Sequence, residues 1–406
     1  MSQAILVGIQ LPGVSDAAHA AGLEELGHLV KTLGYAVVGT LSQKRDAIDG
    51  RTVLGKGRID DLAAIAEDLD AVLVVVDLEV SPSQIRNLEQ AIGIQVLDRT
   101  GMIMEIFHRH ARSREAKLQI EIARLKYIAP RLRDMSGGGE RRQGSGSGES
   151  DLDLDRRTVR DRLAEARREL ADLQRESDRR RAARGDQLRV ALVGYTNAGK
   201  SSLMRALTGS DVLVADQLFA TLDTTVRALR PETTPRVLVT DTVGFIKKLP
   251  HDLVASFRST LAEALEASLL MFVVDASDPA YLSHLAVTRD VLYEIGAGSV
   301  PSCLVLNKID RVSETDRAAL RETHPDAFPL SSLDPADVAA LRQTIIDFFE
   351  ASMVDEHIRV PYAKQALIRD VYETTRVLSQ ESDATGQIFK VRGLPDAIAR
   401  LRKMSA

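Results

Sequence analysis

The sequence contains no tryptophan and a single cysteine, Cys303, among its 406 residues. One cysteine excludes any disulfide within the chain, which fits a reducing compartment, and we expect Cys303 to be a small buried apolar residue. Aromatic residues are few, so no broad surface for stacking nucleic-acid bases is evident. No apolar run reaches the roughly 18 residues that a membrane helix needs, and the N-terminus lacks a signal-peptide layout. We therefore expect a cytoplasmic protein without an integral membrane segment.

A large excess of charge of one sign is also absent, since the formal net charge is only −5. The whole chain is therefore not a polycation, and we expect no DNA partner and a monomeric chain. The length allows about two to four domains. The sequence divides into four parts, which we expect to be an α/β domain (1–110), a helical arm (111–187), a larger domain that carries the motifs described below (188–352) and a small α/β domain (353–406).

Residues 1–110 alternate short β-rich runs with stretches of helical spacing. The expected strands include 4–7, 35–39, 72–77 and 94–98, and the expected helices include 17–32, 56–68 and 83–91. Ser81 followed by Pro82 has the pattern of an N-cap and a first-turn proline. Strands that alternate with helices predict a parallel sheet covered on both faces, which is an α/β fold.

The arm contains two narrow apolar seams with the 4, 3, 4, 3 spacing of a coiled coil. The first seam is Leu118, Ile122, Leu125, Ala129 and Leu132, and the second is Val159, Leu163, Ala166, Leu170 and Leu173. A Gly-rich polar loop, residues 136–148, separates them and is flexible by composition. We expect an antiparallel helical hairpin whose two seams face each other.

Charge in the arm is uneven and admits two interpretations. Residues 109–142 contain ten Lys or Arg against four Asp or Glu, and residues 156–189 contain twelve against seven. The surface of a solvated coiled coil usually carries mixed charge. Alternatively, the arginines lay guanidinium groups on RNA phosphates, with a loop able to follow an irregular RNA surface. The acidic run from Glu149 to Asp155 suits a helix N-terminus.

The larger domain, 188–352, begins with an apolar run, 190–193, followed by a Gly-rich turn and then a helix-like segment. The turn is Gly194, Tyr195, Thr196, Asn197, Ala198, Gly199, Lys200 and Ser201, followed by Ser202. This G-x-x-x-x-G-K-[ST] pattern between a strand and a helix predicts a phosphate-binding loop. Lys200 would reach the β- and γ-phosphates, and the Ser201 hydroxyl would bind Mg²⁺.

Two later strand ends predict the remaining nucleotide contacts. Asp241, Thr242, Val243 and Gly244 follow one apolar run, where the carboxylate would hold Mg²⁺ through a water and Gly244 would contact the γ-phosphate. Asn307, Lys308, Ile309 and Asp310 follow a second run, where Asp310 would accept the two guanine protons that adenine lacks. Ser331, Ser332 and Leu333 fit a last guanine-contacting loop. Four motifs in this order predict GTP as the substrate.

A switch segment lies between the phosphate loop and Asp241. It contains Phe219, Ala220, Thr221, Leu222 and Asp223, followed by two more threonines. One threonine would offer its hydroxyl to Mg²⁺, but spacing alone does not choose among the three. After Gly244 stands Phe245, at a position where many GTPases carry a glutamine that orients the attacking water. We therefore expect slow GTP hydrolysis by the chain alone and stimulation by a partner.

The last part of the chain, 353–406, predicts strands at 358–360 and 387–391, a helix over 364–378 and a further helix that starts at Pro395. We expect this part to pack against the nucleotide domain.

The sequence resembles the HflX family of translation-associated GTPases, in the group that includes the Obg-like proteins. The resemblance is carried by GYTNAGKSS (194–202), FATLDTT (219–225), DTVGFIKKLP (241–250), VLDRTGMIME (96–105) and the segment 115–132. It implies a GTPase that binds the large ribosomal subunit through its arm and N-terminal domain and splits stalled or idle ribosomes under stress. By motif position it assigns Thr221 to Mg²⁺ beside Ser201 and Asp241, with Lys200, Thr221 and Gly244 as catalytic residues.

One departure from the family concerns the arm tip, residues 144–151, which lacks the proline usual there and has Ser150 and Asp151 in place of the expected pair. This departure bears on ribosome splitting more than on GTP hydrolysis. A different class of function also fits the motifs: a regulatory GTP switch that recruits a protein partner through its coiled-coil arm. Steep salt dependence of binding would distinguish RNA phosphates from such a partner.

Overall fold

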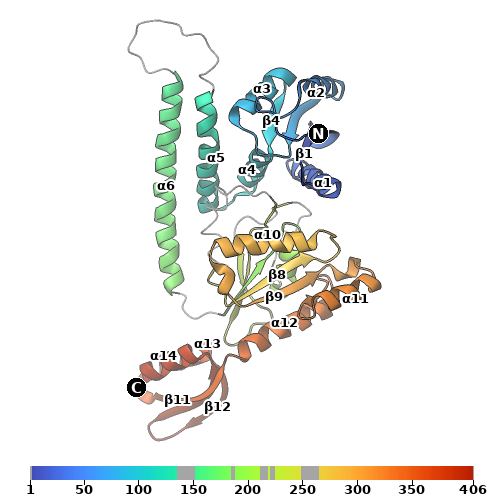
Figure 1. Ribbon diagram of the computed structural model, residues 1–406. Coiled ribbons are helices and arrows are strands. Elements are labelled where there is room, and N and C mark those ends of the chain that lie inside the picture. The colour runs from blue at the N-terminus through green and yellow to red at the C-terminus, as the bar shows by residue number, and fades with distance from the viewer. Residues whose placement is uncertain are drawn as a thin grey trace. The chain divides into compact units, whose positions relative to one another are not determined.

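The computed structural model describes residues 2–134, 151–183, 188–210, 218–219, 225–247 and 265–405 (Figure 1). They form two compact units. The first contains the described residues up to 174 together with residues 218–219, and the second contains the rest. The Gly-rich arm tip and four of the predicted switch residues, Ala220, Thr221, Leu222 and Asp223, lie outside the described ranges. The predicted domain boundaries stay predictions.

The first unit is built around a four-stranded sheet with the strand order β2-β1-β3-β4. Its strands are β1 (Gln3–Gln10), β2 (Ala36–Lys44), β3 (Ala71–Val76) and β4 (Gln95–Asp98), and its helices are α1 (Asp16–Thr32), α2 (Lys56–Asp68), α3 (Pro82–Ile92) and α4 (Arg99–His110). All three strand pairs are parallel, as the sequence predicts. Buried Val, Ile and Leu side chains from β1 and β3 pack with those of α2 and α3.

The start of α3 also agrees with the sequence. The Ser81 hydroxyl accepts the backbone N–H of Gln84, and the Gln84 side chain accepts the backbone N–H of Ser81. Pro82 occupies the first turn of the helix, where its missing N–H costs nothing. This reciprocal capping fixes where the helix begins after β3.

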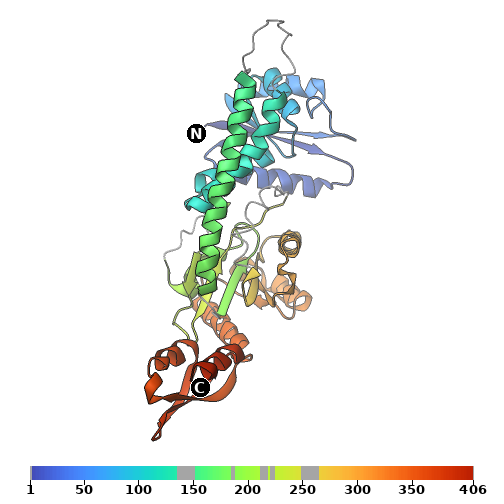
Figure 2. The same ribbon diagram turned by 90° about the vertical axis from the view of Figure 1, so that its left-hand side faces the viewer.

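The arm is a pair of helices, α5 (Arg114–Asp134) and α6 (Asp151–Ala183), which run side by side in both views (Figures 1 and 2). The two predicted seams meet between them. Leu118 and Ile122 of α5 form one buried cluster with Ala166 of α6, and the half-buried side chains of Leu163, Leu170 and Leu173 pack against it. Arg162 of α6 adds an ion pair with Glu121 of α5, with nitrogen–oxygen distances of 2.5 and 2.8 Å.

A buried carboxylate attaches the arm to the N-terminal sheet. Asp98, at the end of β4, is fully buried. It accepts the hydroxyl of Tyr127 on α5 at 2.6 Å, the backbone N–H of Gly101 at 2.7 Å and that of Val80 at 3.2 Å. One side chain thus joins the sheet, the start of α4 and the arm.

The second unit contains a six-stranded sheet with the order β10-β9-β8-β5-β7-β6. Its strands are β5 (Leu188–Val193), β6 (Thr225–Ala228), β7 (Val237–Asp241), β8 (Leu269–Asp275), β9 (Ser302–Asn307) and β10 (Phe328–Pro329), and its helices are α7 (Lys200–Thr208), α10 (Tyr281–Glu294), α11 (Glu314–Thr323) and α12 (Pro335–Glu350). Among the described strands of this sheet, the edge strand β6 is antiparallel to its neighbour and the other pairs are parallel. The parallel strands β5, β7 and β9 therefore end at the same edge of the sheet.

The core of this unit lies between the central strands and helices α7 and α12, with Leu192, Leu203 and Ile345 almost wholly buried. Cys303 of β9 packs against this core as an apolar side chain, as the sequence predicts, although it is partly rather than fully buried. Burial raises the pKa of its thiol to about 11.

The C-terminal part of the second unit is a three-stranded antiparallel sheet with the order β11-β13-β12 and two helices. The elements are β11 (Val354–Pro361), α13 (Leu367–Thr374), β12 (Arg376–Ser382), β13 (Gly386–Gly393) and α14 (Pro395–Ser405), and short 3₁₀ turns lie at Ala297–Ser299, Ile309–Arg311 and Tyr362–Lys364. The predicted start at Pro395 is confirmed, but the predicted helix over 364–378 is wrong at its end. It stops at Thr374 because β-branched Thr375 is extended, with φ −136° and ψ 156°, and the chain then pairs with β13.

Replacement of Tyr127 by Phe tests the attachment of the arm. It removes one hydrogen bond to a buried carboxylate, so the free energy of opening around β4 and α4 should fall by about 1.5–3 kcal/mol. Hydrogen exchange of the amides in β4 and the first turn of α4 measures this. The matched control is Tyr293→Phe, because Tyr293 is 79% exposed and should change nothing. Unchanged protection in the Tyr127 variant would contradict the role of Asp98.

Candidate functional site

The Gly-rich turn between β5 and α7 requires glycine at two positions. A Cβ atom on Gly194 would lie 2.1 Å from the carbonyl oxygen of Val273 on the neighbouring strand. Gly199 has a φ of +91°, and a Cβ atom there would lie 2.2 Å from the side-chain nitrogen of Asn307. These approaches are possible only without a side chain. The loop therefore packs directly onto the strands that carry the other predicted motifs.

Lys200, the first residue of α7, points back into this loop. Its amino group is buried and donates to the backbone carbonyls of Gly194 at 3.0 Å and Tyr195 at 2.9 Å. Burial lowers the pKa of Lys200 to about 8, and the nearby carboxylate of Asp241 offsets part of that shift. The positive charge thus lies where the loop carbonyls converge, inside the curve that the pattern assigns to phosphate oxygens.

Ser201 and Asp241 lie side by side at the ends of α7 and β7. The Ser201 hydroxyl donates to the Asp241 carboxylate at 2.7 Å, and Asp241 is fully buried. The next residue, Thr242, fixes its strand by donating its hydroxyl to the carbonyl of Leu192 at 2.8 Å. A carboxylate beside a hydroxyl is a donor set that fits Mg²⁺, which prefers oxygen ligands and keeps several waters. Thr221, the third predicted ligand, lies outside the described residues.

Gly244 is held against the phosphate loop by the residue that follows it. The backbone N–H of Thr196 donates to the carbonyl of Phe245 at 2.7 Å. The N–H of Phe245 donates to the carbonyl of Gly194 at 3.1 Å. A Cβ atom on Gly244 would lie 2.8 Å from the Cα of Thr196 and 3.2 Å from the Lys200 amino group. Glycine is therefore required here too, and Gly244 lies directly beside the lysine.

Asn307 connects three of the predicted loops. Its fully buried side chain donates to the carbonyl of Ala198 at 2.9 Å and accepts the backbone N–H of Ser332 at 3.1 Å. The phosphate loop, the end of β9 and the loop after β10 are thereby held in one arrangement. Ser331 is buried in the last loop, whereas Leu333 is 74% exposed.

Lys308 and Asp310 extend from the loop after β9. Lys308 has a positive φ of 60°, and its amino group donates to the carbonyl of Asn197 at 2.8 Å and to Asp275 at 2.7 Å. These contacts hold the Lys308 amino group against the phosphate loop. Asp310 lies in the following 3₁₀ turn and is exposed, where an incoming ligand can reach its carboxylate.

The structure brings together most of the residues predicted for this site. The loops that hold residues 194–202, 241–244, 307–310 and 331–333 all follow strands that end at one edge of the second sheet. Phe219 is different, because it groups with the first unit. Its ring is buried against Phe107 of α4, with centroids 4.5 Å apart and an interplanar angle of 76°.

Sequence reasoning missed two carboxylates that support the site. Asp275 pairs with Lys308, and hydrogen bonds from Lys308 and Ser277 outweigh its partial burial and lower its pKa. Asp337 accepts the backbone N–H of Ser331 at 2.7 Å and so holds the loop after β10. The position of Asp275 at the end of the apolar strand β8 could have indicated a site residue. Asp337 lies in the first turn of α12, where an acidic residue is common, so the sequence offered no sign of its contact with the loop.

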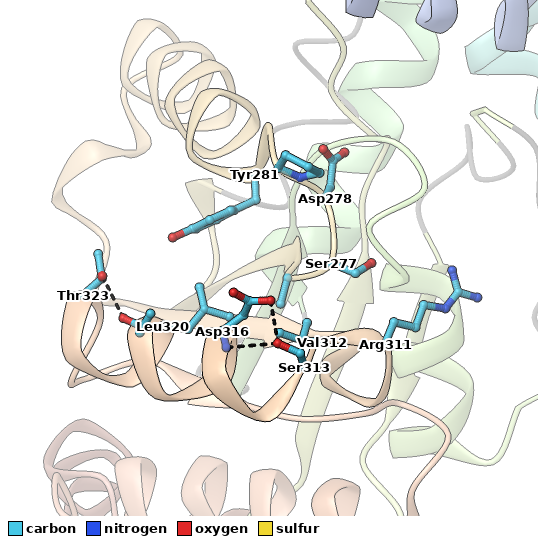
Figure 3. A pocket seen from close by; sticks show the side chains of 12 residues that line it. Ser277, Asp278, Tyr281, Arg311, Val312, Ser313, Asp316, Leu320 and Thr323 are labelled. Atoms are coloured by element: carbon cyan, nitrogen blue, oxygen red, sulfur yellow. Dashed lines mark hydrogen bonds between the residues drawn. The ribbon is translucent and has the colours of Figure 1, made fainter.

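A cavity of about 400 Å³ lies beside the loop that carries Asp310 (Figure 3). Its walls come from the loop after β8, from Tyr281, from Arg311 and from α11. None of the residues predicted to bind nucleotide line it. The carboxylate of Asp316 in its wall accepts the Ser313 hydroxyl at 2.7 Å as part of the cap of α11. We assign no ligand to this cavity.

Three family models match consecutive parts of the chain. A GTP-binding GTPase N-terminal model matches residues 20–108, and a GTP-binding GTPase middle-region model matches 110–184. A model described as a 50S ribosome-binding GTPase matches 189–308. Among the described residues, no helix is both long enough and apolar enough to cross a membrane.

Curated relatives match over nearly the whole chain. The GTPase HflX of Gluconacetobacter diazotrophicus is 62% identical over 99% of this chain and 98% of its own length. The GTPase HflX of Escherichia coli is 35% identical over 95% of this chain and 92% of its own. The crystal structure of SsGBP in complex with GDP is 24% identical, with a TM-score of 0.51, over 86% of this chain and 98% of that chain, which shows a shared fold.

The lowered pKa of Lys200 predicts proton uptake on binding. In the empty protein the amine is about half neutral near pH 8, and contact with phosphate oxygens favours the charged form, so GDP binding should take up about half a proton at pH 8 and about a tenth at pH 7. Affinity should accordingly fall as the pH rises above 8. Titration calorimetry in two buffers of different ionisation enthalpy measures the uptake.

The control for this experiment is Lys200→Arg, because a guanidinium stays charged throughout this range and should take up no proton. Zero uptake by the natural chain at pH 8, or equal uptake in both proteins, would contradict the placement of a partly neutral amine at the phosphate position.

Proposed function

Since this chain belongs to the HflX family of GTPases, we propose that it is a cytoplasmic, GTP-dependent factor that splits or rescues stalled ribosomes under stress. The match of residues 189–308 to a 50S ribosome-binding GTPase model supports the large ribosomal subunit as its partner. The observation that carries the proposal is the arrangement of arginine side chains on the arm helix α6, because it supplies a surface that fits RNA phosphates.

Five arginines in the middle of α6 lie on one face. At about 100° per residue, five arginines and two alanines between residues 157 and 176 fall within one sector about 100° wide, and no acidic residue of that span lies in it. The arginines and alanines are Arg157, Arg160, Ala164, Arg167, Arg168, Ala171 and Arg175. All five arginines are exposed. By sequence position, Asp153 and Asp178, nearer the two ends of the helix, fall in the same sector. The acidic residues Asp161, Glu165, Asp172 and Glu176 occupy the sector directly beside it. A surface in which the basic residues are segregated fits a polyanion better than a solvated face of mixed charge does.

The reaction proposed for the second unit is attack of water on the γ-phosphate of GTP. Lys200 and the backbone N–H groups of the phosphate loop bind the phosphates, and the N–H of Gly244 contacts the γ-phosphate. Thr221 would complete the site from the switch segment by motif position. The described geometry supports the roles of Lys200 and Gly244, because Gly244 lies directly beside the Lys200 amino group.

Mg²⁺ is the cofactor that this site would take. Ser201 and Asp241 would hold it, Asp241 through a water, and Thr221 would join them by motif position. When bound, the ion neutralises charge on the β- and γ-phosphates. The 2.7 Å contact between the Ser201 hydroxyl and the buried Asp241 carboxylate supports this pairing of donors.

Guanine recognition is proposed for the loops that Asn307 holds together. Asp310 would accept the N1 and N2 protons of guanine, the Lys308 stem would cover the ring, and the backbone of 331–333 would contact its edge. The exposure of Asp310 and the fixed course of Lys308 over the phosphate loop support these roles.

Slow hydrolysis by the chain alone follows from Phe245. The side chain after Gly244 is apolar and only 1% exposed, so it cannot orient an attacking water. We propose that the large ribosomal subunit supplies the missing catalytic or ordering group, and that turnover rises when the arm binds RNA.

The experiment measures GTPase rate and binding with purified large ribosomal subunits at two or more salt concentrations. The test variant carries Arg160→Gln, Arg167→Gln and Arg168→Gln. The slope of log affinity against log salt should flatten by about 2–3, and affinity in about 0.1 M salt should fall tenfold or more. Hydrolysis without subunits should stay unchanged, and Lys200→Ala should abolish hydrolysis in every condition.

The matched control neutralises three acidic residues on the same helix, by Asp161→Asn, Asp172→Asn and Glu176→Gln. It should bind subunits at least as tightly as the natural chain does, because it removes repulsion from RNA. Binding that does not depend on salt, and is equal in both variants, would overturn the RNA contact. It would favour a regulatory switch that recruits a protein through its apolar seam.

A further inference from the structure

Tyr195, the second residue of the phosphate loop, holds the segment that follows Gly244. Its side chain is 5% exposed, and its hydroxyl accepts the backbone N–H of Lys247 at 2.7 Å. The main chains of Tyr195 and Phe245 also form a parallel bridge. The Tyr195 side chain thus holds the segment 245–247 at Lys247, and the backbones of its neighbours Gly194 and Thr196 hold it at Phe245.

The ring of Tyr195 lies on a second ring from another element. It stacks on His284 of α10, with centroids 3.8 Å apart and planes within 10° of parallel. The His284 ring is itself oriented by Asp278, whose carboxylate lies 3.4 Å from its Nδ1. A phenol confined between the loop and a stacked ring has a fixed plane, so the position of its hydroxyl is fixed as well.

This arrangement adds a second restraint on Gly244, which Phe245 already holds through its backbone bonds to Gly194 and Thr196. Gly244 immediately precedes the held segment, and its Cα is so close to Thr196 and Lys200 that no Cβ fits. A donor to the γ-phosphate acts only if its N–H points at the phosphate before the ligand arrives. Release of residues 245–247 would free Gly244 to move away from the lysine.

We propose that Tyr195 is a positioning residue that aligns the Gly244 amide for the γ-phosphate, with His284 as the surface that orients it. The inference rests on the role proposed above for Gly244. Because GDP has no γ-phosphate, the pair sets the preference for GTP over GDP and leaves the contacts to the α- and β-phosphates unchanged. Phenylalanine would fill the same space, so packing alone does not explain the hydroxyl.

The test compares affinities for GDP and for a non-hydrolysable GTP analogue, together with kcat for GTP. Tyr195→Phe removes only the hydroxyl, so affinity for the analogue and kcat should each fall about three- to tenfold, the effect of one lost hydrogen bond. Affinity for GDP should stay within about twofold. Tyr281→Phe is the matched control, because Tyr281 contacts His324 and not the phosphate loop, and it should change nothing.

Two substitutions of His284, the residue on which the Tyr195 ring stacks, test the proposal without changing the tyrosine itself. His284→Ala removes the stacked ring and should reproduce the selective loss of the GTP analogue. His284→Phe keeps an aromatic face and should restore the preference for GTP. A merely structural role would weaken both nucleotides together in Tyr195→Phe and His284→Ala, and that result would overturn the proposal.

The Lys200→Ala variant separates failure of this inference from failure of the site. If Lys200→Ala is inactive while Tyr195→Phe retains the full preference for GTP, the nucleotide site stands and the positioning role is wrong. If Lys200→Ala hydrolyses GTP at the natural rate, the nucleotide site itself is wrongly placed, and the positioning role is overturned with it.

Discussion

The buried amide of Asn307 is the interaction on which the nucleotide site depends. Its two ends bond the phosphate loop and the loop after β10, so one side chain joins loops that are far apart in the sequence. A buried amide that lost either partner would leave a polar group without compensation, at a cost of about 1–3 kcal/mol. The close approach of Gly199 to the same side chain admits no other residue. The contacts of Asn307 therefore hold the three loops in one arrangement, so the site is already formed before a ligand binds.

A second constraint of the same kind organises the first unit. The buried carboxylate of Asp98 accepts hydrogen bonds from Val80, which follows β3, from Gly101 of α4 and from Tyr127 of the arm. In both units, a polar side chain at the end of a parallel strand satisfies the backbone around it and sets the position of the element that carries function. Such buried polar centres specify one arrangement more sharply than apolar contacts, which tolerate repacking.

Much of this architecture was predictable because it depends on short-range pattern. The parallel N-terminal sheet, the capped start of α3 and the facing seams of the arm each follow from periodicity or from local capping chemistry. The order of the motifs also predicted which loops meet. The end of α13 was not predictable, because helical spacing continues past Thr374 and only pairing with β13 decides against it.

Besides the end of α13, the sequence pattern did not reveal side-chain contacts between residues that are far apart in the sequence. The stacking of Tyr195 on His284 and the packing of Phe219 on Phe107 depend on the tertiary fold alone. Counting charges along the arm gave a modest basic excess, whereas the helical geometry of residues 157–176 places five arginines and four acidic residues in neighbouring sectors of α6. The role of Thr221 stays a prediction, since it lies outside the described residues.

The environment of Cys303 has a consequence for oxidative damage. Oxidants attack the thiolate, and a thiol with a pKa of about 11 is almost wholly protonated at neutral pH. The sulfur also packs against the core of the second unit on β9, the strand that carries Asn307. Sulfenic acid formation there would put a polar group against the core next to the loop that begins at Asn307. The raised pKa thus keeps the single cysteine mainly as the thiol, the form that oxidants attack more slowly.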